Sequence, residues 1–205
     1  MMPSLDTLFP VPLIHISETN STNSYLQTLC SKQQEVAEFT TVVADFQTSG
    51  RGQRGNSWES EPGKNLLFSF VLFPEFLEAR RQFLISQVMS LAIKEELDSY
   101  TDDISIKWPN DVVVSRKKIC GILTEMGLEK GRIREVVIGD GINVNLEEFP
   151  DELKDKATSL YLETGKKYDR NRLISLIMEK FERNYEKFTE TFDLSPLIDD
   201  YNVML

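Results

Sequence analysis

A glycine-rich segment with two arginines is the first candidate for chemistry in this sequence. Residues 50–55 read Gly-Arg-Gly-Gln-Arg-Gly, and the chain around them has a formal net charge of -10. The glycines permit backbone angles that other residues avoid, and Arg51 and Arg54 bring positive charge. Such a segment suits a phosphate group, and the alternative is a hairpin with solvated arginines.

The same segment matches the G-x-G-x-x-G pattern of dinucleotide-binding sites, but its surroundings argue against that interpretation. In those sites a helix begins at the glycines and directs its amides at the pyrophosphate. Here residues 56–65 contain Pro62 and Gly63 and lead into an apolar run of strand length. We therefore expect a long, mobile loop that carries positive charge.

A second candidate segment is Lys107-Trp108-Pro109-Asn110-Asp111, which places oxygen-rich side chains at a tight corner. The Asp111 carboxylate is suited to Mg²⁺, which proteins commonly hold through one carboxylate and substrate phosphates. Lys118 follows seven residues later, before an apolar strand in which Gly121 allows a ligand to approach. A carboxylate or an α-phosphate would suit Lys118, and the alternative is that residues 116–118 form a solvated hairpin tip.

Two further segments combine small and polar residues. Gly139, Gly141 and Asn143 lie at the end of another apolar run, where the glycines clear space and the asparagine can donate or accept; a simple bulge is the alternative. Residues 17–24 are rich in Ser, Thr and Asn, and helical spacing of apolar residues follows them. We expect a short helix that begins near residues 21–23.

The elements that position these segments are strands in the middle of the chain and helices nearer its ends. Apolar and β-branched runs predict strands over residues 41–46, 66–73, 104–108, 111–114, 119–126 and 133–144. Helical spacing predicts long helices over about 77–100 and 170–190. Sequential strands joined by short turns favour an α+β fold, with a mixed, largely antiparallel sheet and helices packed mainly on one face.

Size and composition restrict the class of protein. A chain of 205 residues with 40% hydrophobic content predicts one main domain, residues 1–190. Residues 191–205 form a C-terminal segment, for which the start of a small β domain is one interpretation. The acidic net charge argues against nucleic-acid binding. There is no apolar run of about 18 residues and no signal peptide, so we expect a cytoplasmic protein without a membrane segment.

Cysteines and histidine exclude several kinds of site. Cys30 and Cys120 are far apart and form no CxxC motif, so we expect two reduced, buried thiols and neither a disulfide framework nor a zinc site. His15 is the single histidine, which excludes a multi-histidine metal centre. It lies in an apolar, strand-like segment, where a packed or edge histidine is the favoured interpretation.

Taken in order, these segments resemble the catalytic domain of biotin-protein ligases. The matching positions are Ser21-Thr22-Asn23, Gln47, the segment 50–55, Trp58, residues 107–111, Lys118 with Gly121, residues 139–144 and residues 157–160. The resemblance covers residues 18–170 and implies the mixed sheet expected above. It implies an enzyme that activates biotin with ATP and Mg²⁺ as biotinyl-5'-AMP. Biotin would then pass to a lysine of a biotin carboxyl carrier protein domain of a biotin-dependent carboxylase, with a homodimer left open.

The resemblance also implies which residues bind each substrate. Biotin-binding positions are Ser21, Thr22, Asn23, Gln47, Gly50, Arg51, Gly52, Gln53, Lys118, Gly121, Gly139 and Gly141. ATP-binding positions are Arg54, Trp58, Lys107, Asn110, Asp111 and Asn143. Lys118, Arg51 and Asp111 are the catalytic positions, with Asp111 reaching Mg²⁺ through the phosphates.

Two residues differ from the family pattern, and two alternative functions have to be weighed against a biotin-protein ligase. Gln53 and Asn56 stand where the family often has arginine, so two cationic contacts to the adenylate are missing. A lipoate-protein ligase shares fold and chemistry, but residues 107–111 match the biotin enzymes better. A non-catalytic biotin or nucleotide sensor is the other alternative, and retention of both Lys118 and Asp111 argues against it.

Overall fold

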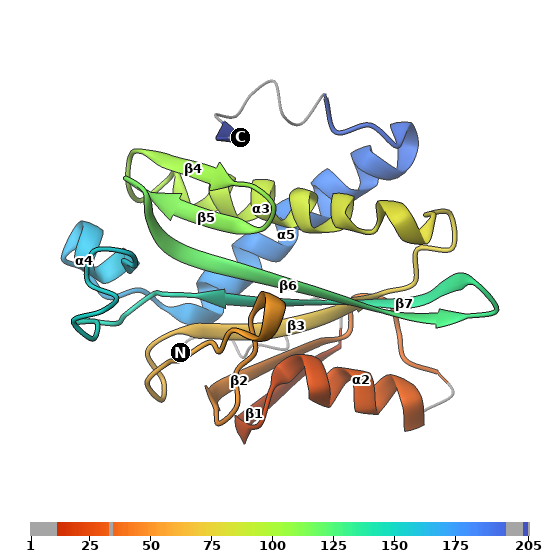
Figure 1. Ribbon diagram of the computed structural model, residues 1–205, viewed down its shortest axis with the longest axis horizontal. Helices are drawn as coiled ribbons and strands as arrows, with labels where there is room; N and C mark the ends of the chain where they lie inside the picture. The colour runs from red at the N-terminus through yellow and green to blue at the C-terminus, as the bar shows by residue number, and fades with distance from the viewer. Residues whose placement is uncertain (1–11, 33–34, 196–202, 205) are drawn as a thin grey trace. The chain divides into compact units, whose positions relative to one another are not determined.

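The computed structural model describes residues 12–32, 35–195 and 203–204 (Figure 1). The chain forms two compact units. The first unit contains Met1–Gln82 and Leu123–Gly141, and the second contains Phe83–Ile122 and Ile142–Leu205. The sequence analysis predicted one domain that ends at residue 190. These two units do not test that boundary, which stays a prediction. Most of the C-terminal segment 191–205 lies outside the described residues.

The strands form a mixed, largely antiparallel sheet. They are β1 Leu13–Thr19, β2 Thr41–Gln47, β3 Leu66–Leu72, β4 Ile104–Lys107, β5 Asp111–Val114, β6 Lys117–Glu129, β7 Arg132–Ile142 and β8 Val203–Met204. Their order is β1-β2-β3-β7-β6-β5-β4-β8. β1 pairs with β2, and β4 with β8, in parallel, whereas β2–β3, β4–β5 and β5–β6 are antiparallel. The predicted α+β class with a mixed, largely antiparallel sheet is confirmed.

In the first unit, helix α2 (Thr22–Lys32) packs on the sheet. The fully buried side chain of Leu26 lies in an apolar cluster with Val42, Val71 and Val137, which come from β2, β3 and β7. The parallel pairing of β1 and β2 needs a crossover, and α2 supplies it. His15 is exposed on the edge strand β1, as the edge interpretation expected.

In the second unit, helices α3 (Phe83–Leu97) and α5 (Arg170–Thr191) pack against each other, and α3 also packs on β4 and β5. The short helix α4 (Leu160–Thr164) precedes α5. The Asp169 carboxylate caps α5 by accepting from the backbone amides of Asn171 and Arg172. One apolar face of α5, which includes Ile177 and Phe181, is buried.

The predicted helix over residues 77–100 begins too early. The Leu77 amide donates to the Pro74 carbonyl in a turn, and Ala79–Arg81 form a 3-10 turn before α3 begins at Phe83. Apolar spacing continues through such turns, so the pattern alone does not mark where the α-helix starts.

The cysteines and the helices allow two further comparisons with the sequence. Neither cysteine forms a disulfide, and Cys120 is buried as expected, whereas Cys30 is only partly buried. Within residues 12–32 and 35–195, none of the helices is both long and apolar enough to span a membrane.

Candidate active site

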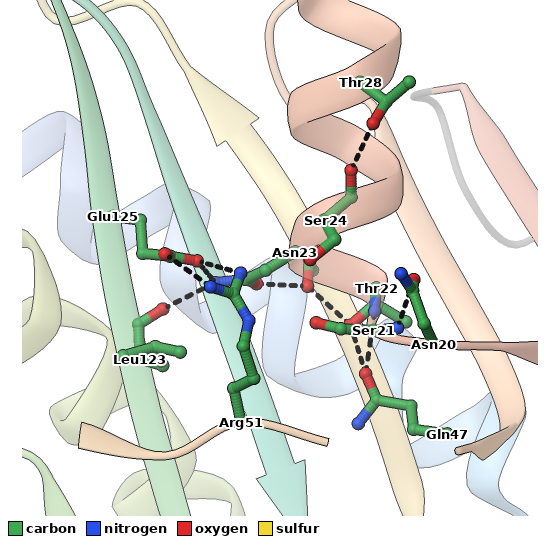
Figure 2. A network of polar contacts seen from close by, with 11 residues as sticks. Asn20, Ser21, Thr22, Asn23, Ser24, Thr28, Gln47, Arg51, Leu123 and Glu125 are labelled. Carbon is green, nitrogen blue, oxygen red and sulfur yellow. Dashed lines mark hydrogen bonds and ion pairs between the residues drawn. The ribbon is translucent and has the colours of Figure 1, made fainter. Parts of the chain in front are cut away.

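The first polar cluster lies where α2 begins. Gln47, the last residue of β2, pairs with Thr19 of β1, so the end of β2 lies beside the turn into α2. The Thr22 amide donates to Gln47 Oε1 at 2.7 Å, and the Thr22 hydroxyl lies 3.1 Å from the same oxygen (Figure 2). Ser21, which precedes the helix, is buried and accepts from the Tyr25 amide through its carbonyl. The structure therefore brings together Ser21, Thr22 and Gln47 as the sequence suggested.

Ser69 is a member of this cluster that sequence reasoning missed. Its fully buried hydroxyl lies 2.7 Å from Thr22 Oγ1 and 2.6 Å from Asn23 Oδ1. All seven residues of β3 are buried, and Ser69 is the polar residue among them. A hydroxyl inside an otherwise apolar run is the signal that could have identified it, because a buried polar group needs a partner.

Asn23 of α2 is joined to β3 and β6 through its side-chain amide. Its Nδ2 donates to the Leu123 carbonyl at 3.2 Å and to Glu125 Oε2 at 2.8 Å, and its Oδ1 accepts from Ser69. A Cβ at Gly139 would lie only 2.0 Å from Asn23 Oδ1, so glycine is required there. Both amide hydrogens of Asn23 are donated to protein acceptors, and Gly139 makes room for this side chain.

Arg51 forms a two-pronged ion pair with Glu125. Its Nη1 donates to Oε1 at 3.1 Å and its Nη2 to Oε2 at 2.7 Å, and both side chains are partly exposed (Figure 2). Glu125 of β6 is the second residue that sequence reasoning missed. A single acidic residue on a half-exposed strand resembles a solvated surface residue, so the sequence contains no strong signal for it.

The glycine-rich segment is a closed hairpin. The Gly52 amide donates to the Asn56 carbonyl at 2.7 Å, the Trp58 amide donates to the Gly50 carbonyl at 2.9 Å, and Gln53–Gly55 form a 3-10 turn. A Cβ at Gly50 would lie 2.3 Å from the Trp58 carbonyl oxygen. The two arms of the hairpin therefore approach too closely for any residue but glycine at position 50. The segment therefore has a defined hairpin geometry, and its mobility stays a prediction.

The Trp58 ring lies directly against β7. A Cβ at Gly141 would come within 2.4 Å of Trp58 Cε2, so the strand allows the indole to approach only because residue 141 is glycine. The structure thus brings Trp58 and Gly141 together. The sequence had suggested that they bind different substrates.

The second unit contains the other group of predicted residues, starting with the corner between β4 and β5. Lys107 is exposed at the end of β4, and the Trp108–Pro109 peptide bond is cis. The buried Asn110 donates through Nδ2 to the Ile122 carbonyl at 2.6 Å, and the Ile122 amide donates to the Asn110 carbonyl at 3.1 Å. These bonds tie the predicted tight corner to β6.

Lys118 and Asp111 lie on one face of the β5–β6 hairpin. Lys118 pairs with Val113 across the hairpin, and Val113 is two residues from Asp111 on β5. Side chains two residues apart on a strand share a face. Lys118 Nζ lies 2.7 Å from Asp111 Oδ1, and both side chains are partly exposed. The pairing register then shifts, so that Gly121 stands opposite Asp111 on this same face.

Asn143 and the segment before α4 support the backbone of Lys118. The Lys118 amide donates to the Lys156 carbonyl, and its carbonyl accepts from the Thr158 amide. The buried Asn143 donates through Nδ2 to the Thr158 carbonyl at 3.1 Å. Lys118 therefore has a backbone held on both sides and a side chain that reaches solvent.

The carboxylates of the second unit can be compared with what a metal ion needs as ligands. Within the described part of the chain, no group of three or more His, Cys, Asp or Glu side chains could hold a metal ion. Asp111 offers one carboxylate. A single carboxylate fits Mg²⁺ that arrives with substrate phosphates, not a metal bound by protein ligands alone.

Comparison with known proteins identifies relatives over most of the chain. A model of the Biotin/lipoate A/B protein ligase family matches residues 16–143. Bifunctional ligase/repressor BirA of Bacillus subtilis (strain 168) is 44% identical over 156 residues, which are 74% of this chain and 47% of the relative. Biotin--[acetyl-CoA-carboxylase] ligase of Paracoccus denitrificans is 32% identical over 164 residues, 76% of this chain and 66% of that protein.

Solved structures agree with these relatives. The biotin protein ligase from Aquifex aeolicus in complex with biotin and ATP has a TM-score of 0.76 and 38% identity, with 89% of this chain and 73% of that chain covered. The apo structure of the biotin protein ligase from Aquifex aeolicus has a TM-score of 0.71 and 34% identity, with 88% and 72% covered. The chain spans about half the length of the first curated relatives that it matches.

Proposed function

The chain belongs to the biotin/lipoate A/B protein ligase family, and on this basis we propose that it is a biotin-protein ligase. The reaction uses ATP to convert biotin into biotinyl-5'-AMP and then transfers biotin to a lysine of a carrier protein. The observation that carries this proposal is the Lys118–Asp111 pair, which places a partly exposed cation and a carboxylate on one strand face. The similar solved structures with 34–38% identity are named biotin protein ligases, which favours biotin over lipoate.

The proposed chemistry needs cations more than it needs a protein nucleophile. The biotin carboxylate attacks the α-phosphate, a carboxyl–phosphate bond forms, and pyrophosphate leaves. The amine of the carrier lysine then attacks the acyl carbon, an amide forms, and AMP leaves. Both reactants of the first step are anions, so preorganised positive charge lowers the barrier. We assign this role to Lys118 and Arg51.

In the proposal, the cluster at the start of α2 binds the polar ring of biotin. The Thr22 hydroxyl has one hydrogen and two neighbouring oxygens, Gln47 Oε1 and Ser69 Oγ. Ser69 in turn donates its one hydrogen to Asn23 Oδ1, because an amide oxygen can only accept. Thr22 Oγ1 therefore keeps lone pairs with which it can accept an N–H donor, and a cyclic urea supplies such donors.

Asp111 fits the magnesium ion that a triphosphate brings, because its carboxylate is partly exposed and can contribute one oxygen. When bound, that ion neutralises charge on the phosphate oxygens. Lys118 already lies 2.7 Å from Asp111, so the carboxylate also orients the lysine before substrates arrive. Asn110 and Asn143 hold the surrounding backbone through their amide hydrogens.

We further propose that the acceptor is a biotin carboxyl carrier protein domain of a biotin-dependent carboxylase and that the reaction takes place in the cytoplasm. One relative is named for an acetyl-CoA-carboxylase acceptor, which supports this class of partner. The net charge of -10 argues against non-specific nucleic-acid binding, so the proposal includes no nucleic-acid partner.

The test is pyrophosphate exchange into ATP by the purified chain, measured with biotin, with lipoate and with neither acid. We expect exchange that depends on biotin, followed by transfer of labelled biotin to a carrier domain. Exchange that depends on lipoate would make the chain a lipoate ligase. Biotin binding without any exchange would make it a sensor, and either result would overturn the proposal.

A further inference from the structure

The ion pair between Arg51 and Glu125 joins two segments that are distant in sequence. Arg51 belongs to the glycine-rich hairpin, and Glu125 lies on β6, 74 residues later. Figure 2 shows both prongs of the pair on one side of Asn23, next to the start of α2. The roles outlined above for Arg51 do not explain what keeps its side chain at this place.

Glu125 is well suited to hold Arg51 because its own position is supported. Its Oε2 accepts from Asn23 Nδ2 at 2.8 Å as well as from Arg51 Nη2 at 2.7 Å. Asn23 is buried and is held by Ser69 and by the Leu123 carbonyl. The carboxylate thus connects the hairpin to a fixed part of the first unit.

The geometry of the pair leaves Arg51 able to bind a second anion. A guanidinium group has five N–H donors, and the two-pronged contact with Glu125 uses one hydrogen on each terminal nitrogen. The Arg51 side chain is 41% exposed, so solvent reaches part of it while the pair with Glu125 is intact. A carboxylate or phosphate can therefore bind to Arg51 without breaking its contact with Glu125.

We propose that Glu125 is a positioning residue that holds Arg51 beside the start of α2, so that the arginine is in place for the anionic substrate groups. This proposal rests on the proposed function, because it takes Arg51 as a residue that contacts those groups. Glu125 acts through Arg51 and need not touch a substrate. The opposite role, in which Glu125 competes with substrate for Arg51, is an outcome of the test.

Limited proteolysis tests the positioning independently of catalysis. Trypsin cleaves after arginine, so the peptide bonds after Arg51 and Arg54 report opening of the hairpin. We expect Glu125→Ala to speed cleavage in this segment about 2- to 5-fold. This factor corresponds to the small stabilisation that a partly exposed ion pair gives the closed hairpin. Glu129→Ala is the matched control, because Glu129 is an exposed residue of the same strand and loses the same charge. Equal cleavage rates for the two variants, with unchanged thermal midpoints, would overturn the proposal.

A double-mutant cycle then tests the link to the reaction. We expect Glu125→Ala to lower kcat/KM for biotin-dependent exchange roughly 5-fold, because Arg51 is then less often in the position from which it contacts the substrate. The same change in an Arg51→Ala background should add less than about 2-fold, since the two residues act as one unit. Glu125→Gln, which keeps one acceptor, should fall between wild type and Glu125→Ala.

Two kinetic results would overturn the inference. Additive losses in the double mutant would show that Glu125 acts separately from Arg51, and a lower KM for biotin in Glu125→Ala would show that it competes with substrate. If the wild-type chain shows no biotin-dependent exchange, the proposed function fails. The proteolysis comparison then still decides whether Glu125 positions Arg51.

Discussion

Asp140 provides a test of how a buried carboxyl group affects the stability of this fold. Its carboxyl group lies on β7 and is buried, and neither oxygen has a hydrogen-bond partner among the described residues. Side chains alternate along a strand, so Asp140 faces away from the side on which Gly139 and Gly141 admit Asn23 and Trp58. Burial raises the pKa of the Asp140 carboxyl well above its ordinary value of 3.8. We predict that replacing it stabilises the protein at neutral pH.

The sign of the pH dependence follows from the raised pKa of Asp140. In the unfolded chain the carboxyl ionises near its ordinary pKa of 3.8, whereas in the folded chain it keeps its proton to higher pH. The folded state thus binds more protons than the unfolded state between these two pKa values. The contribution of Asp140 to stability is most favourable below the unfolded pKa and is lost as pH rises through the folded pKa. Asp140→Asn should remove this slope.

The magnitude is set by the cost of a buried polar group without a partner, about 1–3 kcal/mol. Asp140→Val removes the polar group and keeps a side chain that suits a strand, so it should raise the free energy of unfolding at pH 7 by about that amount. For a chain of this size the thermal midpoint should rise by roughly 2–10 °C. Asp140→Asn should give a smaller rise, because its amide also needs partners.

Urea unfolding between pH 5 and pH 8 would measure both effects, with Asp155→Asn as the control. Asp155 is exposed and undergoes the same change from a carboxyl to an amide, so its variant should keep the wild-type stability and slope. The reasoning would be refuted if Asp140→Val lowered the free energy of unfolding at pH 7 while Asp140→Asn kept the wild-type slope. That result would mean that the carboxylate is ionised and stabilised in the native protein.

Three further predictions concern the second unit. Lys118→Ala should reduce adenylate formation by at least about 100-fold in the exchange assay, as loss of one preorganised contact does, and near-normal turnover would exclude Lys118 from the site. Asp111→Ala should abolish Mg²⁺-dependent use of ATP while calorimetry still detects biotin binding; an equal loss of biotin affinity would place Asp111 with the other substrate. Asp169→Ala should lower the free energy of unfolding by about 1 kcal/mol in urea, because α5 loses its cap, and an unchanged value would show that water replaces it.

The sequence predicted the six central strands to within a few residues. Thr41–Gln47, Leu66–Leu72 and Asp111–Val114 are short apolar runs that end at glycine, proline or polar corners, which are strong local signals. The parallel pairing of β1 with β2 was not predicted. Such pairing depends on how α2 returns the chain to the sheet, and no local pattern specifies that path.

The sequence predicted candidate site residues in segments of unusual composition. It missed two residues whose hydrogen-bond partners are distant in the chain. Arg51 and Lys118 lie in segments whose composition already suggests anion binding, and Asp111 lies at an oxygen-rich corner that suggests Mg²⁺. Ser69 stands out only as a hydroxyl within an apolar strand, and Glu125 has ordinary sequence surroundings. Their partners are 46 and 47 residues away for Ser69, and 74 and 102 residues away for Glu125. Their roles exist only once the sheet has brought those partners together.

The relation between Lys118 and Gly121 shows why spacing alone cannot define this site. They are three positions apart, and in a regular strand two residues an odd number of positions apart have side chains on opposite faces. The register shift on β6 changes this, because Cys120 pairs with Val112 while Lys118 pairs with Val113. One residue, Ile119, is thereby taken up without a partner of its own on β5, and Gly121 returns to the face of Lys118 and Asp111. Cys120 is turned to the buried side instead, where a small apolar thiol is tolerated and a ligand could not reach it.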